Sequence, residues 1–190
     1  MILPIYTYGQ GVLRERADDV HSDSPELQVL IDDMVETMRG AAGIGLAAPQ
    51  IGTGLRLVVI DLLAMEDLNA VAGVVGDAAG ALTLINPEVV LDASSPDVDF
   101  EEGCLSIPDV RETVVRPDRL RLRFLDRHLV PHEVEADGTL ARVVQHELDH
   151  LDGVLFVDHI SPLRRRLLKR RLRMMTRGLV EADYPIEPPA

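Results

Sequence analysis

The segment from Gly138 to Gly153, "GTLARVVQHELDHLDG", constrains this chain more than any other. Its apolar residues recur at helical spacing, and positions four apart on a helix lie on one face. His146 and His150 can therefore reach one metal ion, with Glu147 directly after the first histidine, a spacing typical of metal-dependent hydrolases. Glu147 falls inside the apolar stripe, where a carboxylate carries a desolvation cost that folding alone does not explain. The segment therefore predicts a helix that holds a metal site.

Two histidines do not complete a tetrahedral site, so a third ligand is needed. A continuation His-x-x-Gly-x-x-His, as in one class of zinc peptidases, requires a histidine at position 156, where this chain has Phe156. Downstream, His159 and Glu181 are further candidates; upstream, Cys104 lies in "EEGCLSIP" and is the only cysteine. A lone cysteine is more often a small buried apolar residue than a ligand. The residues by themselves leave the third ligand open.

Composition excludes several classes of protein. The net charge of −13 argues against general affinity for nucleic-acid backbones, and the aromatic content of 3% offers no stacking platform for single strands. No apolar run is long enough to cross a bilayer, and the first residues lack the pattern of a signal peptide. We expect neither a membrane partner nor sequence-specific binding to nucleic acid. A single cysteine suits a reducing compartment, which we take to be the cytoplasm.

The order of the predicted elements favours an α+β fold in one catalytic domain, residues 1–190. A helix over 24–40 begins with Ser24 as N-cap and Pro25 at its first position. Residues 43–52 are glycine-rich and predicted to be irregular, and 62–81 to be a surface insertion. Strands are predicted in "LRLVVID", "LTLINPEVVLD" and "DRLRLRFLD", the last pairing with "LVPHEVEA" as a hairpin. We expect mixed or antiparallel sheets around the central metal-binding helix, with one helix N-terminal and another C-terminal.

The C-terminal helix, predicted within residues 161–180, carries eight basic residues and no acidic one. Leu168, Leu172, Met175 and Leu179 follow helical spacing, which indicates an amphipathic basic helix. Its basic face could dock on the acidic body of the protein or contact ribosomal RNA. Charge reversal of Arg164, Arg165 and Arg166 would separate these alternatives in a ribosome co-sedimentation assay.

Three separated segments together resemble the signature motifs of peptide deformylases: "GIGLAAPQ" (43–50), "EGCLS" (102–106) and "QHELDHLDG" (145–153). They occur in the order found in that family, and the basic C-terminal helix is similar to that of its common bacterial form. "GIGLAAPQ" alone could suggest a phosphate-binding loop, but it lacks the Gly-Lys-Ser/Thr ending and precedes its strand.

The resemblance implies a function and a set of site residues. The activity would be hydrolysis of the formyl group from the N-terminal formylmethionine of nascent polypeptides by a metal-activated water, with release of formate. The implied roles are these: metal ligands Cys104, His146 and His150; proton carrier Glu147; oxyanion donors Gln50 and the backbone N–H of Leu105; and substrate-binding residues Gly43, Ile44, Gly45, Glu102 and Gly103. An apolar pocket would take the methionine, and Arg142 on the metal-site helix could alter its wall.

The cofactor implied is one divalent ion, Fe²⁺ in the cell, with Zn²⁺, Ni²⁺ or Co²⁺ able to substitute, since thiolate and imidazole suit all of them. Implied partners are formylated nascent peptides and, through the basic helix, the ribosome.

Two alternative functions stay open. A zinc metallopeptidase with the His-Glu-x-x-His helix would cleave internal bonds and be indifferent to Cys104→Ser. A non-catalytic, metal-stabilised ribosome-binding protein would tolerate Glu147→Ala.

Overall fold

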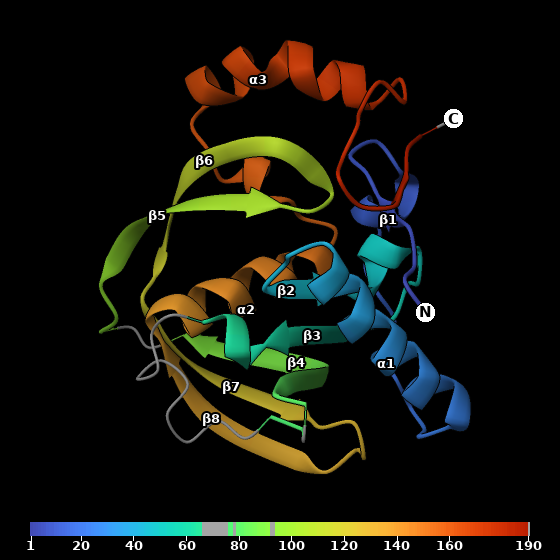
Figure 1. Ribbon diagram of the computed structural model, residues 1–190. Helices are drawn as coiled ribbons and strands as arrows, with labels where there is room; N and C mark the ends of the chain where they lie inside the picture. Colours follow the sequence, from blue (N-terminus) through green and yellow to red (C-terminus); the bar gives the residue numbers. More distant parts are fainter. Residues whose placement is uncertain (66–75, 78, 92–93, 190) are drawn as a thin grey trace.

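Figure 1 shows the computed structural model, which describes residues 1–65, 76–77, 79–91 and 94–189. Three α-helices are present in these ranges: α1 (Pro25–Gly40), α2 (Gly138–Leu151) and α3 (Pro162–Met175). The strands are β1 (Ile5–Tyr6), β2 (Gly45–Ala47), β3 (Leu57–Asp61), β4 (Ala81–Leu91), β5 (Asp97–Cys104), β6 (Ile107–Pro117), β7 (Arg119–Leu125), β8 (Pro131–Asp137) and β9 (Ile186–Glu187). Four short 3₁₀ turns cover Gly11–Arg14, Ala48–Ile51, Leu62–Ala64 and Phe156–Asp158. No helix in the described ranges is both long and apolar enough to span a membrane.

The strands form one large antiparallel sheet and two smaller pairs. The large sheet has the order β2-β3-β4-β7-β8, β5 pairs with β6 as an antiparallel hairpin, and β1 pairs in parallel with β9. This arrangement confirms the predicted α+β class. The predicted hairpin of β7 and β8 is also confirmed, with Leu122 opposite Val134.

Helix α2 lies between the large sheet and the β5–β6 hairpin, which makes it the central element of the fold (Figure 1). Alternation along β3 explains the layering, because successive side chains point to opposite faces of a sheet. Val58 and Ile60 pack in the core cluster that contains Leu140 and Val144 of α2. Leu57 and Val59 pack in a second cluster with α1. Both faces of the sheet are therefore covered where β3 passes.

Helix α1 begins where the sequence predicts. The Ser24 hydroxyl accepts a hydrogen bond from the Leu27 backbone N–H at 3.2 Å, and Pro25 occupies the first helical position, where no N–H is needed. The predicted apolar stripe is the buried face: Leu27, Ile31, Met34 and Met38 are buried, and Leu30 is partly buried against them.

Two predictions about local structure need correction or qualification. Residues 43–52 are not irregular throughout, because Gly45–Ala47 form β2 and Ala48–Ile51 a 3₁₀ turn. The backbone groups of β2 find partners on β3, which the glycine content of the segment conceals. Of the predicted insertion at 62–81, residues 66–75 and 78 lie outside the described residues; the ends are a 3₁₀ turn and the start of β4.

Helix α3 packs on the β5–β6 hairpin and away from the large sheet (Figure 1). Leu172 and Met175 are buried, and Leu168 packs partly buried beside them, as the spacing predicts. Leu179 does not continue the stripe, because the helix ends at Met175 and Leu179 is exposed.

Candidate metal centre and cleft

The metal-site helix and the cysteine segment meet at one point. His146 and His150 lie on one face of α2, with ring centroids 5.2 Å apart. Cys104 ends β5, and its Sγ lies 3.2 Å from Nε2 of His150. The ligand atoms of Cys104, His146 and His150 all lie within 4.8 Å of one another. The three predicted ligands are therefore brought together by segments 46 residues apart in the chain.

The other candidate ligands, His159 and Glu181, do not join the cluster of Cys104, His146 and His150. The His159 Nε2 atom lies 2.7 Å from a carboxylate oxygen of Asp149. Phe156, at the position where a zinc peptidase would carry its third histidine, is buried with its ring stacked 6.1 Å from that of His146. Glu181 lines the cleft described below and is exposed.

The donor set fits a divalent transition metal. Two histidines and one cysteine would supply three ligands and leave the fourth position of a tetrahedral ion to water or substrate, which is typical of catalytic sites. His150 is buried, and its Nδ1 has no hydrogen-bond partner among the described residues. Burial lowers the pKa of His150 well below its usual value, so its ring is neutral and able to ligate.

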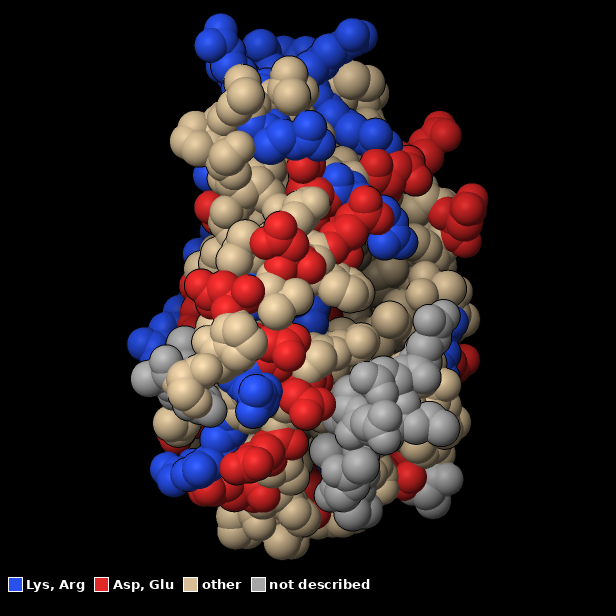
Figure 2. Space-filling model, turned by 90° about the vertical axis from the view of Figure 1, so that its left-hand side faces the viewer, with Lys and Arg blue, Asp and Glu red and all other residues tan. Residues whose placement is uncertain are grey.

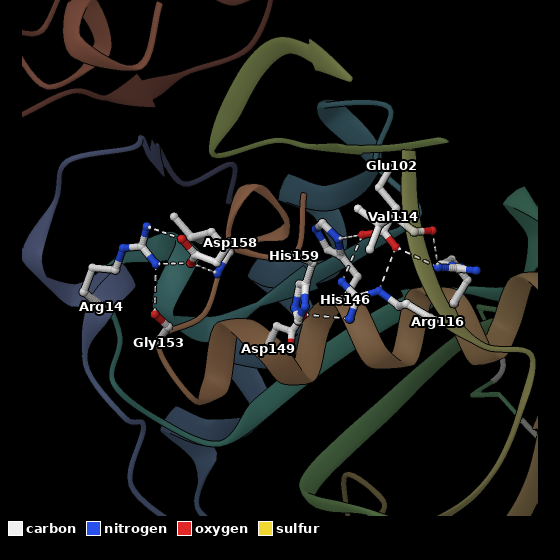
Figure 3. Close-up of polar contacts among 11 residues, drawn as sticks. Arg14, Glu102, Val114, Arg116, His146, Asp149, Gly153, Asp158 and His159 are labelled. Carbon is white, nitrogen blue, oxygen red and sulfur yellow. Dashed lines mark hydrogen bonds and ion pairs between the residues drawn. The ribbon is translucent and has the colours of Figure 1, made fainter. Parts of the chain in front are cut away.

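A buried carboxylate orients the first histidine (Figure 3). Glu102 on β5 accepts hydrogen bonds from Nδ1 of His146 at 3.0 Å and from Nε and Nη2 of Arg116 at 2.7 and 3.0 Å. Burial alone would raise the pKa of Glu102, but the hydrogen bonds from His146 and Arg116 lower it to about 2. Because Nδ1 of His146 is used by this carboxylate, Nε2 is left for a metal. Arg116 also pairs with Asp149 at 2.8 Å, which extends the network along α2.

Arg142 is buried beside this network, although it falls opposite the apolar stripe of its helix. The β5–β6 hairpin covers that side of α2, and Arg142 donates to the carbonyls of Val98 and Val114 at 2.6 and 3.1 Å and to Glu102 at 3.2 Å. Its guanidinium lies 5.7 Å from the ring centroid of Phe100. Arg142 and Phe100 both line the cleft, so Arg142 does form part of its wall.

Glu147 is 4% exposed, and one of its carboxylate oxygens, Oε2, has no hydrogen-bond partner among the described residues. Burial raises its pKa to about 7, the nearby charge of Glu102 adds to that shift, and His146 opposes it. Gly45 on β2 lies directly against this side chain: a Cβ there would be 2.5 Å from Oε1 of Glu147. The buried carboxylate predicted from the helical stripe is thus confirmed, with strand β2 packed against it.

Gln50 is buried, not an exposed loop amide, with an exposed fraction of 1%. Its Oε1 accepts from the Ala47 backbone N–H at 2.8 Å. Its Nε2 lies 3.2 Å from the Ser106 hydroxyl and 3.6 Å from Sγ of Cys104. Ser106 was not singled out from the sequence; its place in "EGCLS" was the one available signal.

A cleft of about 830 Å³ opens over these residues. One wall is the segment Gly43–Gly45, the opposite wall is β5 with the turn that follows it, and His146 and Glu147 line it from α2. The residues to which the resemblance gives substrate or oxyanion binding all line this cleft: Gly43, Ile44, Gly45, Gln50, Glu102, Gly103 and Leu105. Strand β2 is an edge strand, so one side of its backbone is not paired within the large sheet.

Comparison with known proteins gives one consistent family. Residues 2–166 match the family described as polypeptide deformylase. A peptide deformylase from Salinibacter ruber is 55% identical over 186 residues, covering 98% of this chain and 94% of that protein. One from Chlorobium phaeobacteroides is 45% identical, with coverage of 98% and 95%.

Solved structures agree with this assignment. A peptide deformylase from Legionella pneumophila superposes with a TM-score of 0.80 at 41% identity, covering 94% of this chain and 97% of that one. One from Synechococcus elongatus, in complex with actinonin, gives a TM-score of 0.76 at 39% identity, with coverage of 88% and 85%. The chain therefore belongs to the peptide deformylase family, metal-dependent hydrolases that remove the formyl group from nascent peptides.

Proposed function

We propose that this chain deformylates N-formylmethionyl peptides with one divalent ion held by Cys104, His146 and His150. The convergence of these three ligand atoms within 4.8 Å, beside a buried Glu147, carries the proposal. A divalent ion bound there supplies Lewis acidity and lowers the pKa of water that it contacts. The cellular ion proposed is Fe²⁺, with Zn²⁺, Ni²⁺ or Co²⁺ as substitutes, because this ligand set suits all four.

Glu147 is proposed as the proton carrier of the reaction. It follows the ligand His146 directly and lines the cleft, and its unpaired Oε2 is available to an attacking water. In this role it takes the proton of the water and gives it to the amine that leaves. The tight contact with Gly45 limits the carboxylate to few positions, which suits a proton transfer over a short distance.

Gln50 and the backbone N–H of Leu105 are proposed to stabilise the oxyanion that forms when water attacks the formyl carbon. The Gln50 amide is held by Ala47, so that its Nε2 points toward Ser106 and Cys104 at the cleft wall. A donor fixed in advance costs no reorganisation when the charge develops, and removal of one such donor costs about 10²–10³ in rate.

The substrate backbone is proposed to lie between the two walls of the cleft. Gly43, Ile44 and Gly45 supply the β2 side and Glu102 and Gly103 the β5 side. An extended peptide that pairs with an edge strand is recognised through its main chain, so varied sequences are accepted after the first residue. The Glu102 carboxylate is occupied by His146, Arg116 and Arg142, so its contribution to this wall comes from its backbone.

Formate release from a formyl-Met peptide tests the proposal. The zinc- or iron-loaded wild type, purified without oxygen, should release formate, whereas Cys104→Ser and Glu147→Ala should each lose at least about 10²-fold in kcat/KM. An internal peptide bond in the same substrate should stay intact. Internal cleavage that survives Cys104→Ser would favour the metallopeptidase alternative, and no formate from the metal-loaded wild type would refute the proposed activity.

We propose that α3 binds the ribosome through those of its basic residues that form no ion pair with the body of the protein. Arg164, Arg165 and Arg171 form ion pairs with Glu112, Asp158 and Asp109 of the body, so part of the basic face is docked. Four further basic residues of α3 are exposed and form no ion pair with the described residues: Arg166, Lys169, Arg170 and Arg173. In Figure 2 basic side chains gather at the end of the molecule where α3 lies.

The docked residues show which variants test this association. Charge reversal of Arg166, Lys169 and Arg170 removes contacts with RNA but no ion pair with the body, unlike reversal of Arg164 or Arg165. Co-sedimentation with ribosomes should fall in this triple variant and become weaker with salt in the wild type. Unchanged co-sedimentation would contradict the role of α3.

The compartment proposed for this protein is the cytoplasm, because nascent peptides are made there.

A further inference from the structure

The two-residue turn between β5 and β6, Leu105–Ser106, is held from three directions. The Tyr8 backbone N–H donates to the Ser106 carbonyl at 2.8 Å. The Gln50 side chain lies 3.2 Å from the Ser106 hydroxyl. The Tyr184 hydroxyl donates to the Leu105 carbonyl at 2.8 Å. Segments far apart in the chain therefore converge on the turn that follows Cys104.

Tyr184 reaches this turn from the segment that follows α3. Gly178 takes a φ of +70°, and the chain then runs back to form β9, whose Ile186 pairs with Ile5. Pro185 and Glu187 accept backbone hydrogen bonds from Ile5 and Thr7 at 2.9 and 3.1 Å, which anchor the segment. Residues 2–166 match the family, so Tyr184 lies outside the matched residues.

The same segment is part of the cleft. Residues 181–184 line it, and Tyr184 and Leu105 both pack against the same apolar cluster. Burial raises the pKa of Tyr184 to about 12, and the negative charges of Cys104, Asp109 and Asp183 raise it further, so the phenol stays a donor. The hydroxyl therefore keeps its proton near neutral pH and can donate to the Leu105 carbonyl.

We infer that Tyr184 is a positioning residue for the reaction, acting through its hydrogen bond to the Leu105 carbonyl. This inference rests on the proposed function, in which the N–H of Leu105 binds the oxyanion. The carbonyl and the N–H belong to the peptide groups on either side of one residue, so fixing the first limits rotation of the second. An oxyanion donor is effective only within about 2.7–3.1 Å of the developing charge, and small displacements lower the rate.

Tyr184→Phe tests the inference because it removes one hydroxyl and keeps the ring in place. We expect kcat for a formyl-Met peptide to fall about tenfold with KM within about twofold, a smaller loss than removal of an oxyanion donor. Hydrogen exchange of the Leu105 amide in the zinc-loaded enzyme, followed by NMR, should become faster. Tyr6→Phe is the matched control: Tyr6 pairs with Glu187 through its backbone, and loss of its hydroxyl should change neither quantity.

The outcomes are distinguishable. If wild type releases formate and Tyr184→Phe equals it in kcat and in Leu105 amide exchange, the inference is wrong while the proposed function stands. A rise in KM with unchanged kcat would also overturn it, since Tyr184 would then only form the wall of the cleft. If wild type releases no formate, the proposed function itself fails. The exchange measurement needs no substrate, so it tests the link between Tyr184 and Leu105 in every case.

Discussion

Gly45 and Glu147 lie so close together that any side chain at position 45 would have to displace the Glu147 carboxylate. A Cβ there would lie 2.5 Å from Oε1 of Glu147 and 2.9 Å from two of its carbons. The edge strand proposed to bind the peptide therefore also packs on the residue proposed to carry the proton. A change in the position of β2 should therefore affect both substrate binding and proton transfer.

Gly45→Ala should consequently lower activity by displacing Glu147. We expect kcat to fall at least about tenfold, and the free energy of unfolding to fall by about 1–3 kcal/mol from overpacking. Gly54→Ala is the matched control, since a Cβ at Gly54 meets no atom within 4 Å. Steady-state kinetics and urea unfolding of both variants check this. Equal activities of Gly45→Ala and Gly54→Ala would show that Glu147 tolerates displacement.

Glu102→Gln should weaken metal binding, because the glutamine no longer offers a carboxylate to His146. Such partners of metal-bound histidines are typically worth about 10- to 100-fold in metal affinity. Glu112, opposite Glu102 on β6, is also buried but pairs with Arg164 of α3, so Glu112→Gln is a matched control. Competition with a chromophoric chelator measures the zinc affinity of each. Identical affinities for the two variants would contradict the orienting role of Glu102.

Removal of the metal should lower the melting temperature. A ligand at about 100 times its Kd stabilises the folded state by about 2.7 kcal/mol, which corresponds to roughly 5–10 °C for a domain of this size. A chelator should therefore produce a shift of that order in wild type. In Cys104→Ser, which lacks one of the three ligands, the shift should be much smaller. Scanning calorimetry with and without chelator measures the change in melting temperature of both proteins. Equal changes in wild type and Cys104→Ser would mean that the ion binds elsewhere.

The ion pair of Arg39 with Asp61 should make stability depend on pH. Arg39 donates to both carboxylate oxygens of Asp61 at 2.9 Å, and these hydrogen bonds lower the Asp61 pKa below its ordinary value of 3.8. The Asp61 pKa is therefore lower in the folded chain than in the unfolded chain, so the stabilisation is complete above about pH 5. It is lost as the pH falls through 3.8 and then through the folded pKa.

Asp61→Asn should cost about 1–3 kcal/mol at pH 7, and this difference from wild type should shrink as the pH approaches 3.5. The control is Asp32→Asn, because Asp32 pairs with Arg127 at the surface and is 67% exposed, so its removal should cost little. Urea unfolding at several pH values measures both. A cost of Asp61→Asn that does not change with pH would mean that the ion pair is not its cause.

Much of this fold follows from local sequence patterns. Helix α1 was predictable because Ser24 and Pro25 mark its start and one stripe is apolar. Strand β7 was predictable because Leu120, Leu122 and Phe124 alternate with arginines, and the structure buries these three. These patterns involve only neighbouring residues, so they can be recognised without knowledge of the rest of the chain.

The β5–β6 hairpin was not predicted, and its side chains explain why. Along β6 the buried positions include Glu112 and Arg116, whose charges interrupt the apolar alternation of Val110 and Val114. Those charges are buried because partners from distant segments neutralise them, Arg164 from α3 and Glu102 from β5. The same reason hid the burial of Arg142. Among the metal ligands, His146 and His150 were indicated by their spacing on one helix, whereas Cys104 was identified only through a motif resemblance.

The pairing of β1 with β9 affects when the enzyme can finish folding during its synthesis. The Gln10 side chain donates to the Glu187 carbonyl, a contact between residues 177 positions apart. Contacts of such long separation require closure of a large loop, so they form late in folding. During translation, β1 leaves the ribosome long before β9 is made, and the wall of the cleft that holds Tyr184 is missing until then. A chain still being synthesised would carry its metal ligands but not its finished cleft, which separates acquisition of the ion from the onset of full activity.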